Sequence, residues 1–285
     1  MTSKKKKQSQ TDWLVKSYEN PDFLHSPPAR ILRVLSEMIE PAHRFHKHKM
    51  WNTVVFFGSA RTLSGRTARK NLKEIESRVK RSKQVSSKLK SEFKKAKRDV
   101  IMSQYYDDAV KLAEKLTLWF KEIESEYRRF TICTGGGPGI MEAANRGAKK
   151  AKGESVGLNI SLPFEQDPNP YQTRELSFEF HYFFIRKFWF FYLAKALVVF
   201  PGGYGTLDEF FDLLTIIQTE KTKKFMPVIL YGSEYWNKVI NIEEMFKWGT
   251  ISESDLKLFK VYDDIDSAFE YLKSELLKRY INRKK

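Results

Sequence analysis

Two glycine-rich segments in the sequence have the composition of turns that bind anions. Residues 135–139 (GGGPG) and 201–206 (PGGYGT) each follow an apolar, β-branched run and precede a helical pattern. A helix N-terminus offers free backbone N–H groups and a positive dipole end, and glycine lets a phosphate approach that backbone closely. In a parallel sheet both turns lie at one edge, so we expect a cleft there that holds an anionic ligand. Residues 135–139 taken alone are also compatible with a tight structural turn.

The second glycine segment continues into a threonine and two carboxylates. Neither segment has the spacing of a dinucleotide fingerprint or of a P-loop, which disfavours a nicotinamide dehydrogenase and an ATPase. Thr206 and Glu209 are three residues apart, as in a capping box at a helix start. A carboxylate beside a phosphate-binding turn instead suits contact with another part of the ligand, and sugar chemistry is the obvious use.

A strongly aromatic segment before the second turn contains two cations. Ten of the fifteen residues 178–192 are Phe, Tyr or Trp, and residues 178–194 are predicted as a helix that is buried in the protein or against a partner subunit. Charges in such surroundings are costly unless they pair with an anion. We therefore favour an anionic partner for Arg186 and Lys187, the alternative being that both side chains extend past the aromatic rings to water.

The elements that must position these residues alternate between strands and helices. Strands are predicted over residues 53–57, 130–133, 155–160, 196–200 and 226–231. The segments between them have helical patterns, including one that opens at Ile140 after the first glycine turn. This order predicts an α/β fold in which helices cover both faces of a parallel sheet.

Three further segments flank or interrupt that predicted domain, which spans residues 51–285. Residues 1–10 are expected to form a disordered basic tail, and residues 11–50 a helical arm with a break at residues 26–28. The second helix of the arm is predicted to end before Pro41. Residues 65–101 form a basic insertion whose apolar residues alternate spacings of three and four, which indicates a long helix or a helical hairpin.

Composition restricts the class of protein. The 285 residues are 41% hydrophobic and 14% aromatic, which excludes a wholly disordered chain. The longest apolar stretch, residues 188–200, is too short to span a bilayer, so we expect no membrane insertion. The single cysteine, Cys133, excludes an internal disulfide and fits a reducing cytoplasm; it is expected to be a core residue.

The net charge of +16 is concentrated in two segments. Residues 1–10 contain four lysines and no acid, and residues 66–98 contain fourteen Lys and Arg residues against three Glu. The basic segment is compatible with nucleic-acid binding, and equally with a solvated helical face or an oligomer contact. A cluster of His43, His46 and His48 lies among cations without a nearby acid or thiol, so no metal site is predicted.

Several motifs resemble those of the Lonely Guy (LOG) family. Residues 201–209 (PGGYGTLDE) fit its PGGxGTxxE motif, and Arg186-Lys187 stands where that family has an arginine–lysine pair. Residues 57–61 (FGSAR), 135–148 (GGGPGIMEAANRGA) and 158–171 (LNISLPFEQDPNPY) are also similar to its larger bacterial members. The resemblance extends from about residue 18 to residue 275 and leaves out the basic insertion.

The resemblance implies a Rossmann-like doubly wound fold, a homodimer or higher oligomer, and phosphoribohydrolase activity without a cofactor. Family members cleave the N-glycosidic bond of nucleoside 5′-monophosphates such as AMP or cytokinin riboside monophosphates, giving free base and ribose 5-phosphate. The family's catalytic arginine and glutamate correspond to Arg186 and Glu209. The implied substrate contacts are Gly58, Ser59, Gly135, Gly136, Gly137, Gly139, Lys187, Gly202, Gly203, Gly205 and Thr206.

One departure and one alternative accompany the resemblance. Plant members have Met-His-Glu before the arginine–lysine pair, where this chain has Phe183-Phe184-Ile185, so we expect a different base pocket. The alternative function is a non-catalytic carrier or sensor that holds a nucleotide or a pterin cofactor in the same cleft. A decarboxylase, an older label for such proteins, would need pyridoxal phosphate and a Schiff-base lysine, for which the sequence has no local signal.

Overall fold

The computed structural model describes residues 14–125, 129–163 and 167–281, which form two compact units divided between His43 and Arg44. The predicted tail, residues 1–10, lies outside the described residues. The predicted arm, residues 11–50, straddles the division. The first unit contains η1 (Ser17–Glu19), α1 (Pro21–His25), η2 (Pro27–Ala29) and most of α2 (Arg30–Lys47).

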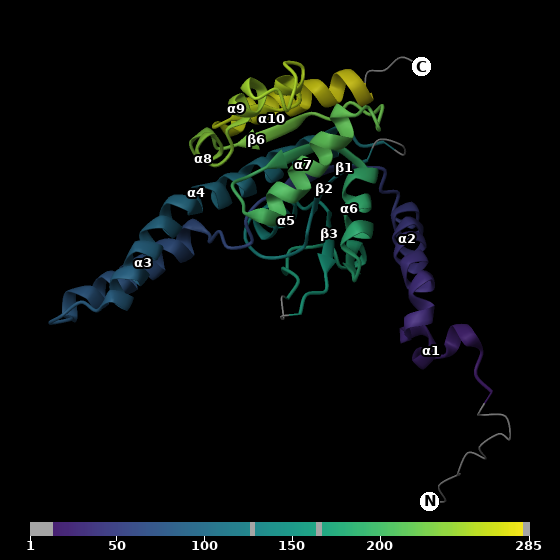
Figure 1. Ribbon diagram of the computed structural model, residues 1–285, viewed down its shortest axis with the longest axis horizontal. Helices are drawn as coiled ribbons and strands as arrows, with labels where there is room; N and C mark the ends of the chain where they lie inside the picture. Colours follow the sequence, from purple (N-terminus) through teal and green to yellow (C-terminus); the bar gives the residue numbers. More distant parts are fainter. Residues whose placement is uncertain (1–13, 126–128, 164–166, 282–285) are drawn as a thin grey trace, which may run out of the picture. The chain divides into compact units, whose positions relative to one another are not determined.

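Seven parallel strands form the sheet of the second unit, in the order β4-β3-β2-β1-β5-β6-β7 (Figure 1). They are β1 (Asn52–Phe57), β2 (Phe130–Thr134), β3 (Ser155–Ile160), β4 (Ser177–Phe180), β5 (Ala194–Val199), β6 (Val228–Tyr231) and β7 (Lys260–Tyr262). The chain moves outward from β1 to β4 and then returns to the other side of β1 with β5. This order creates a topological switch point between β1 and β5, as in Rossmann-like folds. The predicted fold class is confirmed.

Helices cover both faces of this sheet. They are α3 (Gly65–Arg81), α4 (Ser87–Glu122), α5 (Ile140–Lys150), α6 (Phe183–Tyr192), α7 (Tyr204–Gln218), α8 (Ser233–Val239), α9 (Ile242–Lys247) and α10 (Ile265–Leu276), with the short turns η3 (Arg174–Leu176), η4 (Asp255–Lys257) and η5 (Leu277–Ile281). None of the helices in the described part of the chain is long and apolar enough to cross a membrane.

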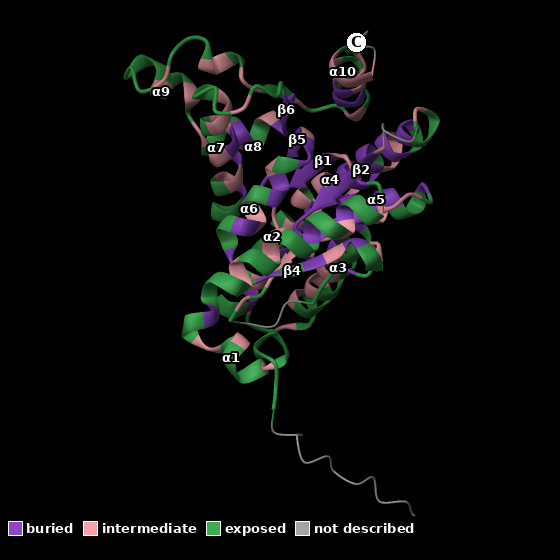
Figure 2. Cartoon of the chain, turned by 90° about the vertical axis from the view of Figure 1, so that its right-hand side faces the viewer, coloured by how far each residue is buried: buried purple, intermediate pink, exposed green. Residues whose placement is uncertain are grey.

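The core is divided by the alternation of side chains along the strands. Val54 and Phe56 of β1 point toward α4, α5 and α10, with which they form one buried apolar cluster. Phe57 points to the opposite face and packs edge-on against Phe190 of α6, 4.8 Å between ring centroids. Figure 2 shows β1 and β2 as buried, and most of the buried residues of α4 lie between Ser103 and Phe120. The site-bearing helix α6 is thus fixed to the central strand.

Two sequence predictions of helix extent are wrong. Residues 178–180 belong to β4, because Phe178 and Phe180 alternate with exposed Glu179 in a two-residue period, so the aromatic helix begins only at Phe183. Helix α2 continues through Pro41 to Lys47. Phe45, beyond the proline, packs against Phe178 with ring centroids 4.7 Å apart, and this tertiary contact supports the last turn.

The basic insertion is a helical hairpin of α3 and the first part of α4, which extends away from the sheet (Figure 1). Ser82 ends α3 and Ser86 begins α4 as its N-cap, where the Ser86 hydroxyl accepts a hydrogen bond from the Leu89 N–H. Helix α4 then continues without a break to Glu122. One helix therefore joins the insertion to the domain core.

Gly139 is a position where the fold requires glycine. Its φ is +71°, and a Cβ there would collide with the carbonyl oxygen of Ser59. We expect Gly139→Ala to lower the free energy of unfolding by about 2–5 kcal/mol, from backbone strain and steric overlap together. Gly249 has a similar φ of +69° with open space around it, so Gly249→Ala should cost only about 1–2 kcal/mol. Urea denaturation measures both, and equal losses would contradict a close contact at Gly139.

Candidate functional site

A cleft of about 770 Å³ lies outside the carboxyl ends of β1 and β5, at the topological switch point. It collects residues from the turn after β1, from α4, from the turn after β2, and from α6, α7 and α8. Its described lining residues are Gly58, Ser59, Ala60, Arg61, Met102, Gly135, Met141, Ile160, Leu162, Phe183, Arg186, Pro201, Gly202, Gly203, Tyr204, Gly205, Thr206, Leu207, Glu209, Tyr235 and Val239. Nine of the thirteen sequence-predicted site residues are among them.

The second glycine turn presents an open helix N-terminus to this cleft. Helix α7 begins at Tyr204 with Gly203 as its N-cap, and within the described residues no side chain caps it. A Cβ at Gly203 or Gly205 would meet nothing within 4 Å. These two glycines therefore have no packing reason to be glycine, and Gly205 costs helix stability. An unobstructed approach to the first N–H groups of α7 is the property that they provide.

The first glycine turn is held internally. The side-chain amide of Asn169 donates to the carbonyl oxygens of Gly136 and Gly137, at 2.9 and 3.0 Å, and that of Gln172 donates to Gly136 at 2.7 Å. Of its four predicted contact glycines, Gly135 lines the cleft, whereas Gly136, Gly137 and Gly139 are not among the described lining residues. The alternative that the sequence left open for residues 135–139, a tight structural turn, fits these three glycines.

Backbone hydrogen bonds tie the turns after β1, β2 and β5 together. The Ser59 N–H donates to the Pro201 carbonyl (3.0 Å), and the Ile140 N–H donates to the Ser59 carbonyl (3.1 Å). The first N–H of α5 is therefore used inside the protein, whereas the start of α7 faces the cleft. This arrangement favours α7 over α5 as the place for an anion.

The only carboxylate among the described lining residues belongs to Glu209. Its Oε1 accepts a hydrogen bond from Nη2 of Arg186 at 3.0 Å, and the two side chains are 12% and 11% exposed. Arg186 also donates weakly to the Leu158 carbonyl (3.4 Å), while its Nε is buried without a partner in the described residues. The guanidinium thus keeps one donor for which the protein supplies no acceptor.

Burial governs the ionisation of this pair. It raises the pKa of Glu209 to about 7, although the Arg186 cation acts in the lowering direction. Burial also lowers the pKa of Arg186, which Glu209 partly offsets. A carboxyl with a pKa near neutrality can accept or release a proton at physiological pH, which suits a general acid or base. By contrast, burial raises the pKa of Cys133, so its thiol stays neutral in β2.

The structure differs from two expectations around α7, the capping box and the position of Lys187. Thr206 and Glu209 are the third and sixth residues of the helix, and Glu209 bonds Arg186 rather than a backbone N–H, so they do not form a capping box. Lys187 is one of the predicted contacts that do not line the cleft. It pairs with Asp208 at 2.8 Å and Asp212 at 3.5 Å on the outer side of α7.

Several lining residues were not selected from the sequence. Arg61 belongs to the segment 57–61 that resembles the LOG family, but no pattern in the sequence indicated that its side chain lines the cleft. Met102 comes from α4 and Tyr235 from α8, far away in sequence; the Tyr235 hydroxyl donates to the Gly202 carbonyl at 2.6 Å. Only the tertiary fold brings them to the site, so no local pattern could have identified them.

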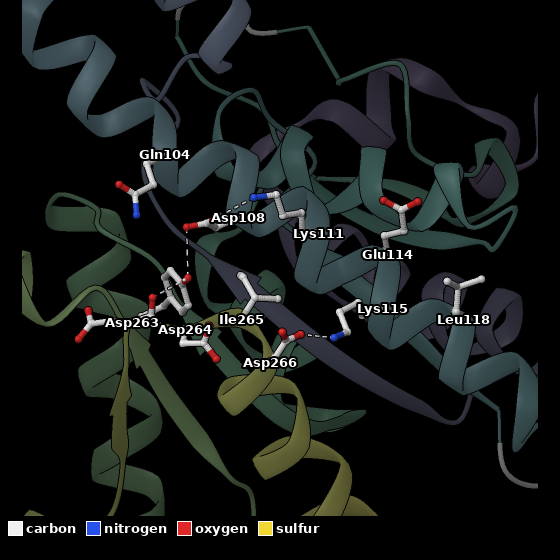
Figure 3. Close-up of a pocket in the computed structure, with 11 residues that line it drawn as sticks. Gln104, Asp108, Lys111, Glu114, Lys115, Leu118, Asp263, Asp264, Ile265 and Asp266 are labelled. Atoms are coloured by element: carbon white, nitrogen blue, oxygen red, sulfur yellow. Dashed lines mark hydrogen bonds and ion pairs between the residues drawn. The ribbon is translucent and has the colours of Figure 1, made fainter.

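A second hollow, of about 570 Å³, lies between α4 and the start of α10 (Figure 3). Both of its lysines are paired with its own carboxylates: Lys111 with Asp108, and Lys115 with Asp266. The Tyr231 hydroxyl lies 3.2 Å from Asp108. These contacts join α4 to the C-terminal elements, and we assign the hollow a structural role.

A switch-point cleft in an α/β fold and an open helix N-terminus are features that phosphate-binding sites share. A family model described as "Possible lysine decarboxylase" matches residues 141–272. Pyrimidine/purine nucleotide 5′-monophosphate nucleosidases of Escherichia coli K12 and O157:H7 are 28% identical over 159 residues. The match covers 50% of this chain and spans about a third of the curated relatives, 33% of their length. The family model and these relatives agree with the resemblance of the chain's motifs to those of the LOG family.

Solved structures with a similar arrangement include the molybdenum cofactor carrier protein of Chlamydomonas reinhardtii. It has 17% sequence identity and a TM-score of 0.46, covering 80% of this chain and 98% of that chain. The molybdenum cofactor binding protein of Rippkaea orientalis has 18% identity and a TM-score of 0.42, covering 60% and 86%.

Gly205 provides a test of the anion position. We expect Gly205→Ala to stabilise the protein by up to about 1 kcal/mol, since alanine favours the helix and has free space there. The same methyl group should weaken binding of ribose 5-phosphate at least about tenfold by obstructing the start of α7. Thermal unfolding and isothermal titration measure the two effects. Unchanged affinity for ribose 5-phosphate would place its phosphate elsewhere.

Proposed function

We propose that the protein hydrolyses the N-glycosidic bond of a nucleoside 5′-monophosphate, releasing the free base and ribose 5-phosphate. The observation that carries the proposal is the buried Arg186–Glu209 pair in the same cleft as the open N-terminus of α7. The 28% identity to nucleotide 5′-monophosphate nucleosidases supports it.

The start of α7 would bind the 5′-phosphate. Backbone N–H groups of residues 203–206 supply donors without a side chain in the way at Gly203 and Gly205. Arg61, in the turn after β1, adds a cation to the wall of the same cleft. Binding the phosphate at this end directs the sugar toward the interior of the cleft, where Glu209 lies.

Glu209 would act on the sugar as the glycosidic bond breaks. The C1′–N bond breaks with its electron pair leaving on the base, which takes up a proton, and positive charge develops at C1′. The Glu209 carboxylate stabilises that charge and takes a proton from the water that attacks C1′. The Arg186 guanidinium holds the carboxylate in place, and its unpartnered Nε offers a donor to the substrate.

The base would lie against the apolar part of the lining. Met102, Met141, Ile160, Leu162 and Phe183 provide flat or flexible contact area without a charged group. Such a surface accepts purines and pyrimidines through their faces. We therefore propose that the protein accepts substrates with different bases, including AMP and cytokinin riboside monophosphates.

Lysine decarboxylation is not supported by this cleft. No lysine occurs among the described residues that line it, and Lys187 is engaged with two aspartates outside. A Schiff-base mechanism therefore has no nucleophile here.

A panel of nucleoside 5′-monophosphates tests the proposal directly. Incubation with AMP, GMP, IMP, CMP, UMP and isopentenyladenosine monophosphate should release free base and ribose 5-phosphate in equal amounts, measured by chromatography. Tight binding of a nucleotide without release of base would favour the carrier or sensor alternative and contradict the hydrolase.

Substitution of the carboxylate gives a sharper test. Glu209→Gln should lower kcat by at least about 10²-fold and leave KM nearly unchanged, because its role is exerted in the transition state. Asp208→Asn is the matched control: the neighbouring carboxylate lies outside the cleft against Lys187, and its loss should change kcat less than about threefold. Similar losses in both variants would refute a specific role for Glu209.

The pH profile follows from the raised pKa of Glu209. A carboxyl that is protonated below about pH 7 cannot accept a proton, so kcat/KM should rise through a limb centred near pH 7. Arg186→Gln removes the cation that lowers this pKa, so the limb should move to higher pH. A limb that stays in place in Arg186→Gln would instead report ionisation of the substrate phosphate.

A further inference from the structure

The basic hairpin, residues 65–101 of α3 and the first part of α4, plays no part in the proposed hydrolysis. Its cations are absent from the described lining of the cleft. It nevertheless contains fourteen of the chain's 51 Lys and Arg residues. Such a concentration of like charge destabilises a compact segment unless counter-charges are present.

The hairpin has an apolar seam and a cationic outside. Ala68, Leu89 and Ala96 are buried where the two helices pack together. All fourteen cations are exposed: Arg66, Arg69, Lys70, Lys73, Arg78, Lys80, Arg81, Lys83, Lys88, Lys90, Lys94, Lys95, Lys97 and Arg98. The seam accounts for the hairpin fold, and it leaves the outer surface of both helices basic.

Few of these cations are neutralised by the protein. In residues 65–101, all of which are described, only Lys70 and Arg78 form ion pairs, with Glu74 at 3.8 Å and with Glu92 at 2.9 Å. Twelve cations remain without a carboxylate partner within the described structure. The surface is thus complementary to an extended anion with many regularly spaced charges.

The length of the hairpin and its exposed side chains indicate which kind of polyanion it would bind. The 17 residues of α3 extend about 25 Å, and a nucleic-acid duplex carries one charge per about 1.7 Å of its axis, so several phosphates match the row of cations. Insertion into lipid needs exposed apolar side chains, and binding of single strands uses exposed aromatic rings. In residues 65–101 the one exposed large apolar side chain is Ile101, and no aromatic ring is exposed, so neither kind of partner is favoured.

We propose that the basic hairpin binds the phosphate backbone of a nucleic-acid duplex, without selecting base sequence. Lysines outnumber arginines nine to five among its cations, and point charges on flexible stems suit backbone contact rather than bidentate reading of bases. Met102, one helical turn after Arg98, lines the cleft. Duplex binding therefore takes place beside the hydrolytic site but uses different side chains.

Fluorescence anisotropy with a labelled 20-base-pair duplex, as DNA and as RNA, tests the proposal. With about four phosphate contacts, the logarithm of the association constant should fall against the logarithm of salt concentration with a slope near −3.6. The variant Lys73→Gln/Lys80→Gln/Lys94→Gln/Lys95→Gln removes four exposed cations without ion pairs. It should bind the duplex at least about tenfold more weakly, with a shallower slope.

A control variant carries the same change in net charge elsewhere. Lys223→Gln/Lys238→Gln/Lys257→Gln/Lys278→Gln removes four exposed lysines outside the hairpin, and its duplex affinity should change less than about twofold. Both variants should retain the nucleotide hydrolysis rate of the parent protein. Equal losses in the two variants, no binding at 50 mM salt, or preference for a single strand or for phosphatidylserine vesicles would overturn the proposal.

Discussion

The buried pairing of Arg186 with Glu209 is the interaction on which the rest of the site depends. A carboxylate this far from water is unfavourable as an anion, and the guanidinium only partly compensates, so the pKa of Glu209 rises to about 7. The pair joins α6 to α7, and α6 is fixed to β1 through Phe190 and Phe57. A group that titrates near neutrality is thereby held in one position by the core of the sheet.

A second constraint keeps the mouth of the cleft in shape. The turns after β1, β2 and β5 share backbone hydrogen bonds through Ser59, and Asn169 closes the first glycine turn. The two glycine turns consequently differ in their use: one is part of the scaffold, and the other leaves Gly203 and Gly205 open to a ligand. Glycine-rich composition alone does not distinguish these two roles.

The sequence predicted the parallel sheet and a cleft at the edge where the glycine turns lie, because these depend on strand composition and on the alternation of strands with helices. The strand order, and with it the switch point, comes from the structure. It failed for β4, where a two-residue burial period was hidden in an aromatic run, and for Pro41, where packing of Phe45 outweighs the local break. Lining residues such as Met102 and Tyr235 come from distant helices, and only tertiary structure brings them together. Whether Gly136, Gly137, Gly139 or Lys187 contacts substrate stays a prediction.

The central claim is that a nucleotide lies with its phosphate at the start of α7 and its sugar at Glu209. A crystal structure of Glu209→Gln with AMP tests it most directly, because the substitution should preserve the substrate. The account predicts phosphate oxygens within hydrogen-bond distance of the backbone N–H groups of residues 203–206, with C1′ next to the side chain of residue 209. AMP bound in the reverse orientation, or outside this cleft, would contradict it.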